Sequence, residues 1–152
     1  MSLASVLLRE DALREHEDGL ALSVRLPWYR SLPLSCVEEI EVALDGEPIP
    51  AENLRLVVGG RERRLDELQA RHDEEWFVRD PASILVPRPV RAGEAHDVRV
   101  AIRCRIPYIS TAPDTPLRQV TERALELTVQ PAAPPSSPTI PDPLDGAGSS
   151  PE

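Results

Sequence analysis

The stretch LALSVRLPWYRSLPLSCVEEIEVALDGEPI, residues 20–49, decides the fold. Within it, residues 20–26 alternate large apolar side chains with small or polar ones, and residues 39–44 do the same. This period of two predicts two β-strands, each with one face toward a core. Residues 27–35 form the loop between them, and Asp45-Gly46 predicts a tight turn after the second strand.

The same alternation recurs along the chain at intervals of about ten residues, with turn residues in between. It predicts further strands at residues 54–58, 76–78, 84–86, 96–106 and 125–129. The segment between residues 61 and 75 suits one or two exposed helical turns or a loop, and no segment suits a crossover helix between parallel strands. We therefore expect an all-β fold, an antiparallel β-sandwich of about eight strands with at most one short helix.

The composition sets the expected limits of the sandwich. After Gln130 the sequence is rich in proline and serine and has almost no large apolar residue, which is typical of disorder. We expect residues 1–18 to be an N-terminal arm, residues 19–130 the β-sandwich domain, and residues 131–152 a disordered tail.

The charge of the chain narrows the classes of function. The net charge is −9, and all 17 basic residues are arginine. The absence of lysine excludes Schiff-base chemistry and the Walker lysine, and an acidic chain without a basic cluster argues against binding nucleic acid. No apolar run is long enough to cross a membrane, and the N-terminus does not read as a signal peptide, so we expect a cytoplasmic protein.

Two cysteines, Cys36 and Cys104, lie on expected strands. An inter-sheet disulfide, as in immunoglobulin-type domains, is one interpretation. A reducing compartment favours the other, in which both are buried and inert thiols.

No catalytic or metal-binding motif stands out. The histidines His16, His72 and His96 are far apart, without the spacing of a metal site. The run RHDEEW around His72 reads as a solvated charge run, and His96, at the start of a strand, suits a structural role. Neither a nucleophile elbow nor a glycine-rich phosphate loop is present. We expect no catalytic residue and no metal ligand in this chain.

Two loops concentrate the few aromatic residues. Residues 27–35 carry Trp28, Tyr29 and Arg30, and residues 107–118 carry Tyr108 and three prolines. Tyr, Trp and Arg dominate binding hot spots, so we expect these four residues to contact a partner or substrate. An alternation of strand directions places both loops at the same end of the sandwich. The alternative is that Trp28 and Tyr108 only cap the core.

A row of arginines, Arg99, Arg103 and Arg105, lies along one face of the expected strand at residues 96–106. It is a second possible surface. Pairing with acidic residues on neighbouring strands explains it equally well.

The order of these motifs resembles a known family. RLPWYRSLPLS is followed by VEEIEVALDGEPIP, GGRERRLDEL, EWFV and GEAHDVRVAIRCRIPYI. The series is similar to the β subunit of bacterial C-glycoside deglycosidases over about residues 19–109. The motifs concern fold and surface more than catalysis.

The resemblance implies a specific kind of complex. Such β subunits are β-sandwiches that assemble, in a higher hetero-oligomer, with a TIM-barrel α subunit of the sugar isomerase type. The α subunit holds a divalent metal, usually manganese, and the catalytic base, so this chain would bind no cofactor. The complex acts as a lyase that cleaves the carbon–carbon bond between a 3-oxo sugar and an aromatic aglycone. The alternatives are a stand-alone carbohydrate-binding β-sandwich and a free-standing hydrolase.

Overall fold

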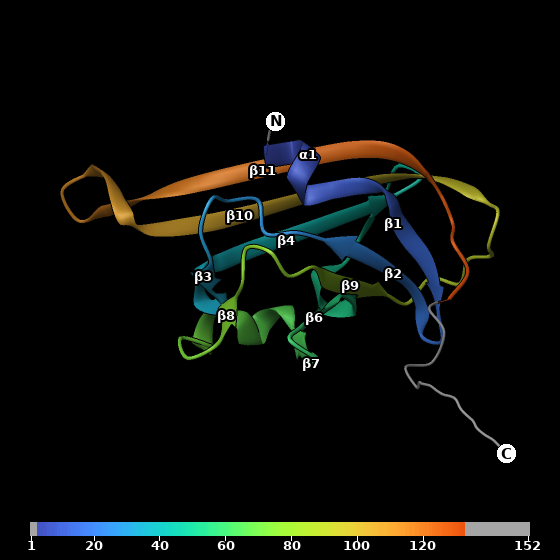
Figure 1. The fold of residues 1–152 in the computed structure, drawn as a ribbon, viewed down its shortest axis with the longest axis horizontal. Coiled ribbons are helices and arrows are strands. Elements are labelled where there is room, and N and C mark those ends of the chain that lie inside the picture. Colours follow the sequence, from blue (N-terminus) through green and yellow to red (C-terminus); the bar gives the residue numbers. More distant parts are fainter. Residues whose placement is uncertain (1–2, 133–152) are drawn as a thin grey trace, which may run out of the picture.

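A computed structural model describes residues 3–132 as a sandwich of antiparallel sheets (Figure 1). The five-stranded sheet has the order β1 (Leu8–His16), β2 (Gly19–Val24), β9 (Ala82–Val86), β6 (Arg55–Val58) and β7 (Arg61–Arg64). The four-stranded sheet has the order β11 (Thr115–Thr128), β10 (Ala95–Ala112), β4 (Val37–Leu44) and β5 (Glu47–Ile49). A two-stranded sheet joins β3 (Leu32–Pro33) to β8 (Glu75–Trp76).

Among residues 3–132, helical structure is confined to short segments. They are α1 (Leu3–Leu7) and three 3-10 turns, η1 (Leu34–Cys36), η2 (Ala51–Asn53) and η3 (Leu65–Ala70). Of residues 3–132, no helix has the length and apolar character that a membrane span requires. The predicted all-β sandwich is confirmed, and the 3-10 turn η3 falls where helical turns were expected.

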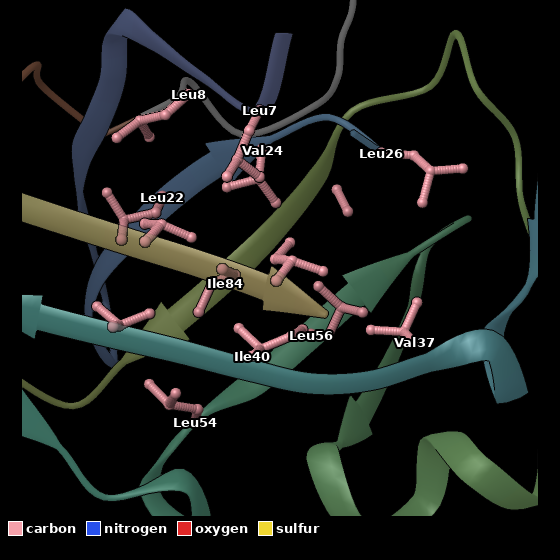
Figure 2. Close-up of a cluster of buried hydrophobic side chains, with 14 of the residues drawn as sticks. Leu7, Leu8, Leu22, Val24, Leu26, Val37, Ile40, Leu54, Leu56 and Ile84 are labelled. Atoms are coloured by element: carbon pink, nitrogen blue, oxygen red, sulfur yellow. The ribbon is translucent and has the colours of Figure 1, made fainter. Parts of the chain in front are cut away.

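The core lies between the two large sheets. Figure 2 shows Ile40 of β4 facing Ile84 and Leu56 of the opposing sheet. The residues predicted to point inward on residues 20–26, 39–44 and 96–106 are all at most 3% exposed. Burial of this apolar surface is the main free energy that stabilises the sandwich.

The N-terminal segment differs from the expected arm. Leu7, Leu8, Ala12 and Leu13 are buried, and β1 pairs antiparallel with β2 as an edge of the five-stranded sheet. The register slips between Leu8 and Leu13, so the apolar residues of β1 do not keep a period of two. A strand with such an irregularity gives no clear alternation in the sequence. The folded unit therefore begins well before residue 19.

The second difference concerns residues 107–118, which were expected to be a loop. Pro107–Ala112 continue β10, Pro113 and Asp114 form the turn, and β11 starts at Thr115. Asp114 has a φ of 60°, which Asp tolerates better than most residues. Figure 1 shows the hairpin, gold and orange, projecting at the left beyond β3 and β8. The prolines that suggested a loop are accommodated in an exposed hairpin.

The chain closes across both sheets at its described end. Leu127 and Val129 are buried, and the amide of Gln130 donates to the carbonyl of Leu13 on β1 at 2.9 Å. The predicted tail, residues 131–152, lies outside the described residues apart from its first two.

Both cysteines are free and buried. Cys104 lies on β10 opposite Val37 of β4, and Cys36 ends the 3-10 turn η1 directly before Val37, so neither cysteine lies on the five-stranded sheet. An inter-sheet disulfide of the immunoglobulin kind is therefore not what this fold contains. Burial raises the pKa of the Cys104 thiol to about 12, which keeps it protonated and unreactive.

Candidate functional site

The loop after β2 turns Trp28 inward and leaves its two neighbours outside. The Trp28 side chain is 9% exposed and packs against the core, while its backbone amide donates to the carbonyl of Leu26 at 2.9 Å. Its indole Nε1–H donates to the hydroxyl oxygen of Tyr108 at 2.5 Å. A buried indole needs such an acceptor, and here a residue 80 positions further along the chain supplies it.

Tyr108 reaches Trp28 because β10 bulges at this point. Ile106 pairs with Leu117, but the next pair is Ser110 with Pro116, so residues 107–109 have no partner on β11. A bulge of this kind bends its strand and re-aims the side chains that it carries. Pro107 lacks a backbone N–H, and it suits a position outside the ladder.

Tyr29 and Arg30 complete the group on the outside. The ring of Tyr29 is 5.1 Å from that of Trp28 between centroids, tilted by 55°, and its side chain is 73% exposed. The guanidinium carbon of Arg30 lies 5.5 Å from the centroid of the Tyr108 ring, a cation–π contact. We call Trp28, Tyr29, Arg30 and Tyr108 the aromatic cluster.

The structure therefore brings all four predicted contact residues together. The expectation that residues 27–35 and Tyr108 lie at one end of the sandwich is confirmed by the Trp28–Tyr108 hydrogen bond. The capping interpretation holds for Trp28, which seals the core. Tyr29 and Tyr108, 73% and 51% exposed, remain available to a binding partner.

Sequence reasoning missed a third exposed aromatic residue at this end. Phe77 is 57% exposed and follows Trp76, which is fully buried. The amide of Val78, next to Phe77, donates to the hydroxyl of Ser31 at 2.9 Å, which links this turn to the loop after β2. The sequence predicts a short strand at residues 76–78, but β8 ends at Trp76, and Phe77 follows it on the surface.

The predicted arginine row is engaged within its own sheet. Arg99 is paired with Glu41 and Glu122, and Arg103 with Glu39 at 3.3 Å. This confirms the cross-strand pairing interpretation over that of a free basic surface.

One carboxylate organises the base of the hairpin. The Glu38 side chain is 10% exposed, and it accepts from Nε of Arg103 at 3.3 Å and from Nε of Arg118 at 2.9 Å. Arg105 approaches its other oxygen at 3.9 Å. Glu38 thus ties β4 to β10 and β11 just below the aromatic cluster.

The segment around His72 contains a second such carboxylate. Glu74 is paired with Arg63 at 2.5 Å, and with Arg61 and Arg71 at 3.8 and 3.9 Å. These pairs occupy its oxygens, which fits a structural role better than metal binding. His96 also has structural partners, Asp45 at 2.8 Å and Glu94 at 3.3 Å.

Among the described residues, His16, Glu17 and Asp18 are the group whose potential metal-ligand atoms lie within 4.8 Å of one another. They form the turn between β1 and β2, at the end of the molecule opposite the projecting hairpin (Figure 1). The Nδ1 of His16 accepts the amide N–H of Asp18 at 3.0 Å. Exposed acidic groups of this kind are common on protein surfaces, and this one is remote from the aromatic cluster.

The outer face of the four-stranded sheet has a shallow hollow of about 430 Å³. Ala43 and Ala124 form its floor on either side of Arg99, and Asp97 and Glu126 lie at its edge. No aromatic side chain lines it. A sugar platform built on aromatic stacking is therefore not found in this hollow.

Comparison with known proteins gives a consistent result. The sequence model of the family described as C-glycoside deglycosidase beta subunit matches residues 4–108. A 3'-dehydrocarminate deglycosidase beta subunit from Microbacterium sp is 42% identical over 106 residues, which cover 70% of this chain and 80% of that protein. C-glycoside deglycosidase beta subunits from Microbacterium trichothecenolyticum and Arthrobacter globiformis are 38% and 37% identical, covering 77% and 74% of this chain and 88% and 87% of their own lengths.

Proposed function

The chain belongs to the C-glycoside deglycosidase beta subunit family, and from this premise we propose that it is the accessory β subunit of a heteromeric C-glycoside deglycosidase. The observation that supports this role best is the aromatic cluster. Tyr29, Arg30 and Tyr108 are residue types that dominate protein interfaces, and they sit on a rigid support at one end of the sandwich.

The proposed partner is a TIM-barrel α subunit of the sugar isomerase type. It would hold the divalent metal, manganese, and the catalytic base. The His16–Glu17–Asp18 group of this chain does not fit a catalytic metal centre, because it is an exposed turn with the imidazole Nδ1 already engaged. The part that this chain would play is to bind the α subunit, with the aromatic cluster at the contact, in a higher hetero-oligomer in the cytoplasm.

The proposed reaction of the complex is a carbon–carbon lyase reaction. A 3-oxo group on the sugar acidifies the neighbouring C–H, and a base on the α subunit removes that proton. The electron pair forms a double bond in the sugar, and the bond to the aromatic aglycone breaks. The aglycone leaves with the bonding electrons and is protonated, and the sugar is released unsaturated.

The rival function, a stand-alone carbohydrate-binding module, needs an exposed aromatic platform. Trp28 and Trp76 are 9% and 0% exposed, so neither can stack on a sugar ring. The platform would have to consist of Tyr29, Phe77 and Tyr108. It predicts glycan binding by the isolated chain in calorimetry, which the subunit proposal does not.

Co-expression tests the proposal. This chain and a sugar isomerase-type TIM-barrel subunit should co-purify, and the complex should cleave a 3-oxo-C-glycoside that neither chain cleaves alone. The double variant Tyr29→Ala/Arg30→Ala should weaken the complex by about 10- to 100-fold. Val120→Ala is the matched control, because Val120 is 61% exposed on β11 away from the cluster.

Two results would contradict the proposal. The first is that the two chains elute separately. The second is that the barrel alone is soluble and fully active.

A further inference from the structure

The hairpin continues past the point where the sandwich ends. Ile106 is fully buried, but residues 107–115 are all exposed, and Pro116 is only half-buried. We call Pro107–Pro116 the docking arm. A two-stranded ribbon without a core of its own is marginally stable in water. An arm of this kind therefore gains order from whatever covers it.

The base of the arm is fixed in direction. The Trp28–Tyr108 hydrogen bond of 2.5 Å ties the bulged residues 107–109 to the end of the core, and the guanidinium of Arg30 lies over the Tyr108 ring. The Glu38 pairs with Arg105 and Arg118 hold the two strands just below. A preorganised arm loses less conformational entropy on binding than a free loop.

The composition of the arm differs from that of the chain. Its sequence is PYISTAPDTP, in which Asp114 is the only charged residue, while 28% of the whole chain is charged. Depletion of charge, with aromatic residues present, is the compositional signal of the buried centre of an interface. Ile109, 37% exposed, and Tyr108 supply apolar contact area, and the serine and threonines supply small hydrogen-bonding groups.

We propose that the docking arm inserts into a cleft of the α subunit, where it continues the contact begun by Tyr29 and Arg30. This rests on the proposed function, which supplies the partner. Ile109 and the turn make the contact, and Trp28 acts as a positioning residue through the hydroxyl of Tyr108. The subunit names of the relatives imply a partner chain of another kind. Two copies of this chain, each with a net charge of −9, repel each other.

A shortened arm tests the proposal directly. Replacing residues 107–116 by Asn-Gly joins the paired residues Ile106 and Leu117 through a two-residue hairpin turn. The isolated variant should unfold within a few degrees of the wild type, because the arm lies outside the core. Its affinity for the purified barrel subunit, measured by biolayer interferometry, should fall by about 100-fold or more.

A matched pair of point variants tests whether the docking arm contacts the α subunit, even if the shortened chain fails to fold. Ile109→Asp places a charge on the arm, and Val120→Asp places the same charge on exposed β11 outside it. Ile109→Asp should weaken binding by about 10-fold or more, and Val120→Asp by less than about twofold.

The positioning role has its own readout. Tyr108→Phe should weaken binding by several-fold and alter the near-ultraviolet circular dichroism of the isolated chain, because the Trp28 indole loses its acceptor. If Tyr108→Phe binds the barrel subunit as tightly as the wild type does, Trp28 does not position the docking arm.

The two levels of the hypothesis fail differently. If the wild-type chain binds the barrel and the Ile109→Asp and shortened variants bind equally well, the docking arm is wrong and the subunit role stands. If the wild-type chain does not bind the barrel, the subunit role itself is wrong. Self-association of the chain that depends on the arm would assign the arm to a second copy and overturn the choice of the α subunit.

Discussion

At the scale of single residues, Gly19 has the most constrained backbone position. Its φ is 135°, and a Cβ there would lie 2.3 Å from the carbonyl oxygen of Val86 and 2.6 Å from the amide nitrogen of Arg88. Both contacts are with backbone atoms of the neighbouring strand and its exit, which cannot move aside without breaking the sheet. Only glycine fits where β2 begins.

Gly19→Ala should therefore destabilise the chain by about 3 kcal/mol or more, as steric overlap adds to the strained φ. Gly46→Ala is the control: its φ is 83°, but nothing lies within 4 Å of the added Cβ, so the cost should be about 1 kcal/mol. Urea unfolding measures both. Equal losses would show that the close approach at Gly19 is not the cause.

His96 gives the stability a dependence on pH. The hydrogen bond to Asp45 raises the pKa of His96 above 6.5, with a further contribution from Glu94, and the pKa of Asp45 is lowered chiefly by His96. A raised pKa in the folded state stabilises the protein below the unfolded pKa of about 6.5, and this stabilisation is lost as pH rises through the folded value. The Asp45 contribution is lost in turn as pH falls through its lowered pKa.

The pair should therefore stabilise the fold most at mildly acidic pH. Between pH 6 and pH 8, the free energy of unfolding should fall more in the wild type than in Asp45→Asn. Asparagine keeps the left-handed φ of 51° that this turn position needs, so the variant removes the carboxylate and leaves the turn in place. Parallel pH profiles for the two proteins in urea unfolding would contradict this.

At the scale of elements, strands were predictable where their pleat is regular. The inward residues of β2, β4 and β10 could be read from alternation alone, since each has one face on the core. Alternation failed for β1, whose register slips between Leu8 and Leu13, and at the arm, where three residues bulge from β10. The four residues of the aromatic cluster could be chosen from the sequence by their residue types. The hydrogen bond between Trp28 and Tyr108, 80 positions apart, could be found only in the structure.

Glu38 links β4 to β10 and β11, and its contribution to the free energy of unfolding can be tested. Glu38→Gln would leave Arg103, Arg105 and Arg118 around a neutral, 10% exposed side chain. Because the arginines are partly solvated, we expect a loss of about 2 kcal/mol, below that of a fully buried pair.

Glu122→Gln is the comparison, because Glu122 also pairs with an arginine of β10 but is 48% exposed. Its loss should be below about 1 kcal/mol. If the two variants lose the same stability in thermal unfolding, the burial of Glu38 does not strengthen its ion pairs.

At the scale of the whole molecule, the extent of the fold differs from the extent of the family match. The match ends at residue 108, inside β10, yet β11 forms the longest ladder of the structure with β10 and carries the buried Leu127. Val129, 2% exposed, then hydrogen-bonds to Gly93 and Glu94 just before β10, and Gln130 bonds to β1. The family model therefore ends before the strand that covers one edge of the core.

Truncation tests where the folded unit ends. A chain that ends after Ala132 keeps all of these contacts and should unfold within about 2 °C of the full-length chain, since a difference of 1 kcal/mol shifts the midpoint by roughly 4 °C in a domain of this size. A chain that ends after Tyr108 loses β11 with Leu127 and Val129, exposes one edge of the core, and should show no cooperative transition. Circular dichroism on heating measures both chains. A cooperative transition in the shorter chain would mean that β11 is an addition to the sandwich and not part of its core. One of the two strands that support the docking arm would then be dispensable for folding.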